Sequence, residues 1–170
     1  MRTLLLIDAN SIIHRSFHAL PPFTAPDGRP TGALYGLSSI LLKLWREEKP
    51  AEGEARPINN EDRFKGRPDY VAALFDRPEP TFREEKYKEY KAQRPPAPDT
   101  LISQIIEARN LFQKFGVKTF EAAGFEADDL IATLAEKFSL EPDLQVVILP
   151  GDKDPLQLVR GEKIVVRTFK

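Results

Sequence analysis

Several residue types are absent or scarce in this sequence, and each absence removes a class of function. The 170 residues include no cysteine, and the formal net charge is −1. Without cysteine the chain can form neither a disulfide nor a thiolate zinc site, and it has no thiol nucleophile. With no net positive charge, the chain as a whole does not attract a polyanion, so any nucleic-acid site must be a local basic surface.

Long apolar runs and nucleotide-binding loops are also missing. Near the N-terminus only residues 4–7 are continuously apolar before Asp8, which is too short for a signal sequence or a membrane span. The sequence contains neither a GxxxxGK[ST] loop nor a GxGxxG motif, so a nucleotide cofactor is not supported. We therefore expect a cytoplasmic protein that has no membrane partner.

Short apolar segments alternate with helical patterns along the chain. The predicted strands cover residues 4–7, 70–75, 117–120, 146–149 and 164–166, and the predicted helices cover 32–46, 99–115 and 125–138. Asp99 is the expected N-cap of the second helix, and Gly116 its expected stop signal. This alternation predicts a single α/β domain over 1–170, doubly wound and three-layered, with a mainly parallel sheet flanked by helices.

Two segments interrupt the alternation. Residues 50–68 are polar and charged and are predicted to form a surface insertion, to which we assign no function. Residues 78–98 contain prolines at both ends of a strongly charged stretch, 81–94, which is predicted to be one helix. Thr81, with Glu84 three residues later, has the spacing of a capping box for that helix.

Three of the predicted strands are followed by an aspartate: Asp8, Asp76 and Asp152. In a parallel sheet the C-terminal ends of the strands meet at one edge, where α/β proteins bind their ligands. A single aspartate after a strand is most often a turn residue or a helix N-cap. Three of them at the same edge favour a shared site instead.

Further acids are expected near the same edge of the sheet. Glu126, Asp128 and Asp129 open the predicted helix at 125–138, and three carboxylates in four residues exceed what the helix dipole needs. Their repulsion would raise their pKa values unless cations lie among them. Asp154 follows Asp152 by two residues, although it alone could be a cap.

The predicted metal ligands are all carboxylates: Asp8, Asp76, Glu126, Asp128, Asp129, Asp152 and Asp154. Such hard oxygen ligands suit Mg²⁺ or Mn²⁺ rather than zinc. Two or more of these ions can catalyse phosphodiester hydrolysis without a protein nucleophile.

Basic and aromatic side chains share one face of the predicted helix at 81–94, at spacings of three and four residues: Arg83, Tyr87, Tyr90, Lys91 and Arg94. This combination can bind phosphates and stack on splayed bases. A solvated helix with Glu–Lys pairs would show a similar composition. The nearby acids favour the DNA-binding interpretation.

Together these motifs resemble the 5′-to-3′ exonuclease domain of bacterial DNA polymerase I, which is related to flap endonucleases and the PIN-like superfamily. The matching stretches are LID at 6–8, RSFHA at 15–19, TGALYG at 31–36, FD at 75–76, TFREEKYKEYKAQR at 81–94, GFEADD at 124–129 and GDKDPLQL at 151–158. The resemblance implies that the seven acids hold or orient metal ions, through direct or water-mediated contacts.

The resemblance also implies roles for the basic residues. Arg83, Lys91 and Arg94 would lie on a helical arch through which a single-stranded 5′ end passes, and they are the predicted catalytic cations. Arg15 would lie near the scissile phosphate, Lys91 would assist at that phosphate, and Tyr90 would stack on a base. The predicted DNA-binding residues are accordingly Arg15, Arg83, Tyr87, Tyr90, Lys91 and Arg94.

The expected function is that of a metal-dependent 5′-3′ exonuclease or 5′-flap endonuclease in DNA replication and repair. Its expected partner is DNA with 5′ flaps or ends. Family members continue beyond the segment matching Ile164–Val166 into two more metal-site aspartates and a helix-hairpin-helix, so we expect Lys170 to precede part of the domain. Further expected partners are a DNA polymerase domain or a second chain that supplies the missing C-terminal part. The alternatives are a non-catalytic DNA-binding remnant and, less favoured by the charged segment at 81–94, a PIN-like ribonuclease.

Overall fold

A parallel sheet forms the centre of the computed structural model, which describes residues 1–46 and 67–167. Within these residues the sheet has five strands in the order β3-β2-β1-β4-β5, and all neighbouring pairs are parallel. The strands are β1 (Arg2–Asp8), β2 (Tyr70–Leu74), β3 (Lys118–Phe120), β4 (Leu144–Leu149) and β5 (Ile164–Val166). All five predicted strands are confirmed, with ends that differ by up to two residues.

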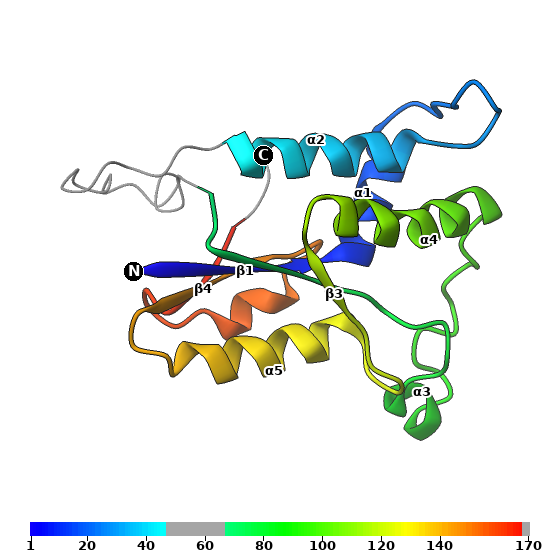
Figure 1. Ribbon diagram of the computed structural model, residues 1–170. Coiled ribbons are helices and arrows are strands. Elements are labelled where there is room, and N and C mark those ends of the chain that lie inside the picture. The colour runs from blue at the N-terminus through cyan, green and yellow to red at the C-terminus, as the bar shows by residue number, and fades with distance from the viewer. Residues whose placement is uncertain (47–66, 168–170) are drawn as a thin grey trace.

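Helices cover both faces of the sheet, as a doubly wound domain requires (Figure 1). One face is covered by α1, α2 and α4, and the other by α5. The helices are α1 (Ala9–Ala19), α2 (Gly32–Arg46), α3 (Phe82–Lys86), α4 (Asp99–Lys114) and α5 (Ala127–Ser139), with the short 3-10 helix η1 at Asp154–Leu158. The predicted three-layer α/β fold is therefore confirmed. No helix among the described residues is long and apolar enough to cross a membrane.

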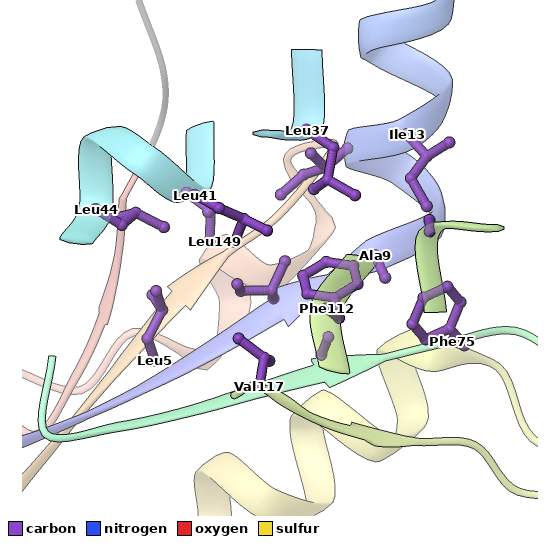
Figure 2. Packing of buried hydrophobic residues seen from close by; sticks show 14 of the residues in the cluster. Leu5, Ala9, Ile13, Leu37, Leu41, Leu44, Phe75, Phe112, Val117 and Leu149 are labelled. Carbon is purple, nitrogen blue, oxygen red and sulfur yellow. The ribbon is translucent and has the colours of Figure 1, made fainter. Parts of the chain in front are cut away.

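The continuous apolar run in β1 follows from burial on both sides. Successive side chains of a strand point to opposite faces, so Leu5 and Ile7 pack under α1, α2 and α4, whereas Leu4 and Leu6 pack against α5. Figure 2 shows the first of these clusters, in which Phe112 of α4 meets Phe75 edge to face with ring centroids 5.7 Å apart. Because Phe75 is fully buried, this packing holds the end of β2 in place just before the edge of the sheet.

The start of α4 differs from the expectation. The N-cap of α4 is Pro98 rather than Asp99, because the Pro98 carbonyl accepts the Leu101 N–H at 2.8 Å. Asp99 is the first helical residue, where its charge still interacts favourably with the helix dipole. The helix ends as predicted, since Gly116 has a φ of 72° that favours glycine.

Helix α1 was not predicted, although its first turn carries a recognisable signal. Asp8 caps it by accepting the Ser11 N–H at 3.0 Å. Ile12, Ile13 and Ser16 are buried against the sheet and α2. Because polar residues interrupt the apolar stripe of this helix, its helical periodicity is hard to recognise in the sequence.

The prediction of one helix over 81–94 is wrong. Only α3 is helical, and residues 88–93 form turns in which Lys91 has a φ of 56°. The capping box is also wrong, because the Thr81 hydroxyl makes no cap hydrogen bond and is buried without a partner among the described residues. In the folded chain Arg83 and Lys91 bind Asp129 of α5 and its N-cap residue Glu126, contacts that the periodicity of 81–94 does not encode. The predicted insertion at 50–68 falls largely on 47–66, outside the described residues.

Candidate metal centre

The three aspartates that follow strands meet at the C-terminal edge of the sheet. Strand β1 lies between β2 and β4, and its last residue, Asp8, is level with Leu74 at the end of β2. Asp76 and Asp152 follow β2 and β4 by a few residues. Helices leave this edge on opposite faces (Figure 1), which makes it the switch point where open α/β sheets bind ligands.

Asp128, in the first turn of α5, has the most perturbed environment of these acids. Its pKa is raised to about 7 by burial and then by the charges of Asp8, Asp152, Asp76 and Asp154. Its Oδ1 atom is buried and has no hydrogen-bond partner among the described residues. A half-buried carboxylate surrounded by four others is stable as an anion only if a cation compensates it.

Asp8 is the most buried of these acids. It is only 5% exposed, and burial raises its pKa, with smaller contributions from the charges of Asp76 and Asp152. The hydrogen bonds from Ser11 oppose that rise. Asp8 is therefore part of the same electrostatic group as Asp128.

Backbone N–H groups orient several of these carboxylates. Besides the Asp8–Ser11 contact, Asp76 Oδ1 accepts the Ala127 N–H at 2.7 Å, which ties the end of β2 to the start of α5. Asp152 Oδ1 accepts the Asp154 N–H at 2.9 Å. These three hydrogen bonds fix the orientation of Asp8, Asp76 and Asp152 at the same edge of the sheet.

The other two predicted metal ligands are paired with basic side chains. Arg83 donates two hydrogen bonds to Asp129, at 2.7 and 2.6 Å, and Lys91 Nζ lies 2.5 Å from Glu126 Oε1. Tyr90 donates its hydroxyl to Glu126 Oε2 at 3.1 Å. The Arg83 hydrogen bonds lower the pKa of Asp129. Burial lowers the pKa of Lys91, but its hydrogen bond and ion pair with Glu126 outweigh burial and raise it.

The seven predicted ligands therefore fall into two groups: Asp128 with the four acids around it, and two acids that are held by cations. Among the described residues no three Asp, Glu or His side chains lie where they could hold one ion together. The donor set still fits a hard divalent cation, because it consists of carboxylate oxygens and includes the orphaned buried oxygen of Asp128.

The remaining predicted DNA-binding residues lie around this edge on the surface. Tyr87 is 69% exposed at the end of α3, and its N–H bonds the Arg83 carbonyl at 2.8 Å. Arg94 is exposed, and its charge contributes to lowering the pKa of His14 on α1, after burial and His18. Arg15 is also exposed on α1. Segment 87–94 and α1 thus border the same site, and the roles of these residues toward DNA stay predictions.

Two residues that the sequence reasoning missed hold the site together. A Cβ added to Gly151 would lie 1.9 Å from the Ser11 Cβ, so the loop after β4 rests directly on the first turn of α1. This contact brings Asp152 toward Asp8. Ser11 was detectable as the third residue after an N-cap aspartate, but the need for glycine at 151 comes from a residue distant in sequence.

Comparison with known proteins agrees with this geometry. Residues 3–170 match the family model described as the 5′-3′ exonuclease N-terminal resolvase-like domain. The chain is 40% identical over 166 residues to a 5′-3′ exonuclease of Aquifex aeolicus, covering 98% of this chain and 51% of that protein. It is 41% identical over 166 residues to DNA polymerase I of Pseudomonas aeruginosa, covering 98% of this chain and 16% of the polymerase.

Solved structures show the same fold. A crystal structure of T5 D15 protein co-crystallized with metal ions superposes with a TM-score of 0.65 at 18% identity, covering 99% of this chain and 55% of that one. A structure of T5 5′-exonuclease with bound zinc gives a TM-score of 0.58 at 20% identity, with the same coverage. The chain spans about half the length of the Aquifex exonuclease and of the T5 protein. It belongs to the 5′-3′ exonuclease N-terminal, resolvase-like domain family and is homologous to the 5′ nuclease domain of DNA polymerase I.

Proposed function

We propose that the carboxylates around Asp128 form the metal centre of a 5′-3′ exonuclease that hydrolyses DNA phosphodiesters. The observation that carries the proposal is the convergence of acids from β1, α5 and the segments after β2 and β4 on one edge of the sheet. Burial and then the charges of these acids raise the pKa of Asp128 to about 7. A protein retains such mutual repulsion chiefly where a function needs it.

The residues divide the chemistry between them. Asp8, Asp76, Asp128, Asp152 and Asp154 would hold the divalent ions, which supply Lewis-acid stabilisation for phosphodiester hydrolysis. Glu126 and Asp129 would join them once their cation partners move.

The phosphate would be bound by basic groups from two sides of the site. Arg83, Lys91 and Arg94 come from the segment that follows β2, and Arg15 comes from α1. These groups would keep the scissile phosphate against the acids, and Tyr87 and Tyr90 offer rings for base stacking. Membership of a family that includes DNA polymerase I domains supports DNA as the substrate, with 5′ flaps or ends as the preferred form.

Cleavage of a 5′-labelled flap duplex in Mg²⁺ tests the proposal. Asp8→Asn should lower the cleavage rate at least ~10²-fold, because it removes charge from the centre, while asparagine can still cap α1. Asp143→Asn is the matched control, because Asp143 is exposed beside the opposite end of β4. This variant should cleave the flap at the wild-type rate. Wild-type activity in Asp8→Asn would refute the metal centre.

One observation favours the non-catalytic alternative: within residues 1–46 and 67–167 no three carboxylates are arranged to hold one ion. It predicts that the wild-type chain binds the flap duplex but does not cut it at any Mg²⁺ or Mn²⁺ concentration. The same assay, read with a gel-shift measurement, separates the two.

A further inference from the structure

Three ion pairs attach the segment after β2 to the start of α5, because Arg83 pairs with Asp129 and, at 3.5 Å, with Glu126, and Lys91 pairs with Glu126. Arg83 uses two nitrogens to bind both oxygens of Asp129, and Lys91 and Tyr90 occupy the two oxygens of Glu126. These side chains are poorly exposed, at 12% for Glu126, 20% for Asp129, 30% for Lys91 and 31% for Arg83. Such sheltered pairs are screened less by solvent than surface pairs.

We propose that Arg83 and Lys91 are built-in counter-ions of the metal centre, which compete with divalent cations for Glu126 and Asp129. The inference rests on the proposed function and adds a coupling between metal binding and the release of these two basic side chains. A carboxylate oxygen engaged by a guanidinium or an ammonium must exchange that partner before it can ligate an ion. Conversely, an arginine bound through two nitrogens to Asp129 cannot use them for a DNA phosphate. Metal loading therefore frees the two cations for the substrate.

The segment is attached in a way that permits this exchange. Its base is fixed where Phe82 packs on Phe125, with centroids 5.7 Å apart, and where the Phe82 N–H bonds the Gly124 carbonyl at 3.0 Å. Its far part consists of turns, with Lys91 in the left-handed region at φ 56°. This conformation is costly for a lysine, and the bond to Glu126 is one of the contacts that hold the segment, together with the hydrogen bonds within its turns. Loss of that bond would release residues 87–94 while Phe82 stays anchored.

Competition of this kind has a reciprocal signature. If a cation side chain and a metal ion exclude each other at the same oxygens, removing the side chain must strengthen metal binding. A side chain that merely supports the fold would, on removal, weaken metal binding or leave it unchanged.

The first experiment measures Mn²⁺ affinity by the loss of free Mn²⁺ resonance signal, without DNA, for the whole chain and three variants. Lys91→Gln and Arg83→Gln should each bind Mn²⁺ about 5–20-fold more tightly than wild type. Lys88→Gln is the matched control, because it removes the same charge from an exposed position of the same segment. Its affinity should stay within about twofold of wild type, which separates displacement from a general change in charge.

The second experiment needs no variant and so does not depend on the folding of Arg83→Gln. Hydrogen exchange of the wild-type amides of Tyr90, Ala92 and Arg94, which bond carbonyls within the turns, should become faster when Mn²⁺ is added. Equal Mn²⁺ affinity of all four proteins, or slower exchange at these amides, would overturn the competition and leave the metal centre standing. Absence of Mn²⁺ binding in every protein would overturn both.

Discussion

Replacement of Asp128 by asparagine is expected to abolish Mg²⁺-dependent cleavage and, without added divalent ions, to stabilise the folded chain. Cleavage should fall by at least ~10²-fold, because the variant loses the carboxylate on which four other acids converge. Stability should rise because folding raises the pKa of this group from 3.8 to about 7, so the charged form is disfavoured in the folded state. Asparagine removes that penalty, which we place at about 1–2 kcal/mol once solvent screening is allowed for.

The sign of the pH dependence follows from the raised pKa. The folded state holds a proton on Asp128 that the unfolded state has already lost, so wild-type stability should decline as pH rises from about 4 to about 7. Asp128→Asn should lack that part of the decline. Added Mg²⁺ should restore stability to wild type but not to the variant, because a ligand that binds the folded state stabilises it by mass action.

Asp129→Asn is the contrasting neighbour for this measurement. Arg83 lowers the pKa of Asp129, so this carboxylate stabilises the fold above its unfolded pKa and loses that effect only as pH falls through its folded value. Thermal melts at pH 5, 6, 7 and 8 should therefore show Asp129→Asn below wild type throughout and Asp128→Asn above it at the higher pH values. A lower melting temperature for Asp128→Asn at pH 8 would contradict our account of its environment.

Replacement of Gly151 by alanine should damage both the fold and the site. The new Cβ would lie 1.9 Å from the Ser11 Cβ and 3.0 Å from the Ser11 Cα, so the loop after β4 must move away from α1. Overpacking of this kind costs about 1–3 kcal/mol. The movement carries Asp152 away from Asp8, so Mn²⁺ affinity and cleavage should fall together.

A second substitution tests whether the clash is the cause. Ser11→Gly removes the side chain that the alanine meets but keeps the backbone N–H that Asp8 accepts as the N-cap, so Gly151→Ala with Ser11→Gly should recover part of the lost melting temperature and Mn²⁺ affinity. Ser11→Gly alone should cost about 0.5–1 kcal/mol as a glycine within a helix, in addition to the lost side-chain hydrogen bond to Asp8. If Gly151→Ala keeps wild-type stability and affinity, the close approach of the loop to α1 does not support the site.

Much of the fold could be predicted because it depends on short-range patterns. Short apolar or β-branched segments of three to six residues identified every strand of the described sheet, and their alternation with helices implied parallel pairing. That pairing places the residues after β1, β2 and β4 at one edge. The grouping of Asp8, Asp76 and Asp152 could therefore be inferred without coordinates, and so could the helix that carries Asp128.

Other features depend on contacts that local patterns do not encode. The stretch at 81–94 has the spacing of a helix, yet it breaks after Lys86 because Arg83 and Lys91 bind acids 46 and 35 residues further along the chain. Periodicity describes how a segment could arrange its own backbone, but it carries no information about charges that folding brings beside it. The same basic residues that suggested a DNA-binding face thus became partners of the predicted metal ligands.

The sequence by itself determined the layers of the domain, the order of its strands and of α2, α4 and α5 along the chain, and the acidic character of the proposed site. Only the tertiary structure decided which carboxylates lie around Asp128, which are paired with cations, and why position 151 must be glycine. The physical reason is range. Backbone periodicity and capping act over a few residues, whereas Coulomb interactions and steric contacts act between any groups that the sheet and its helices bring together.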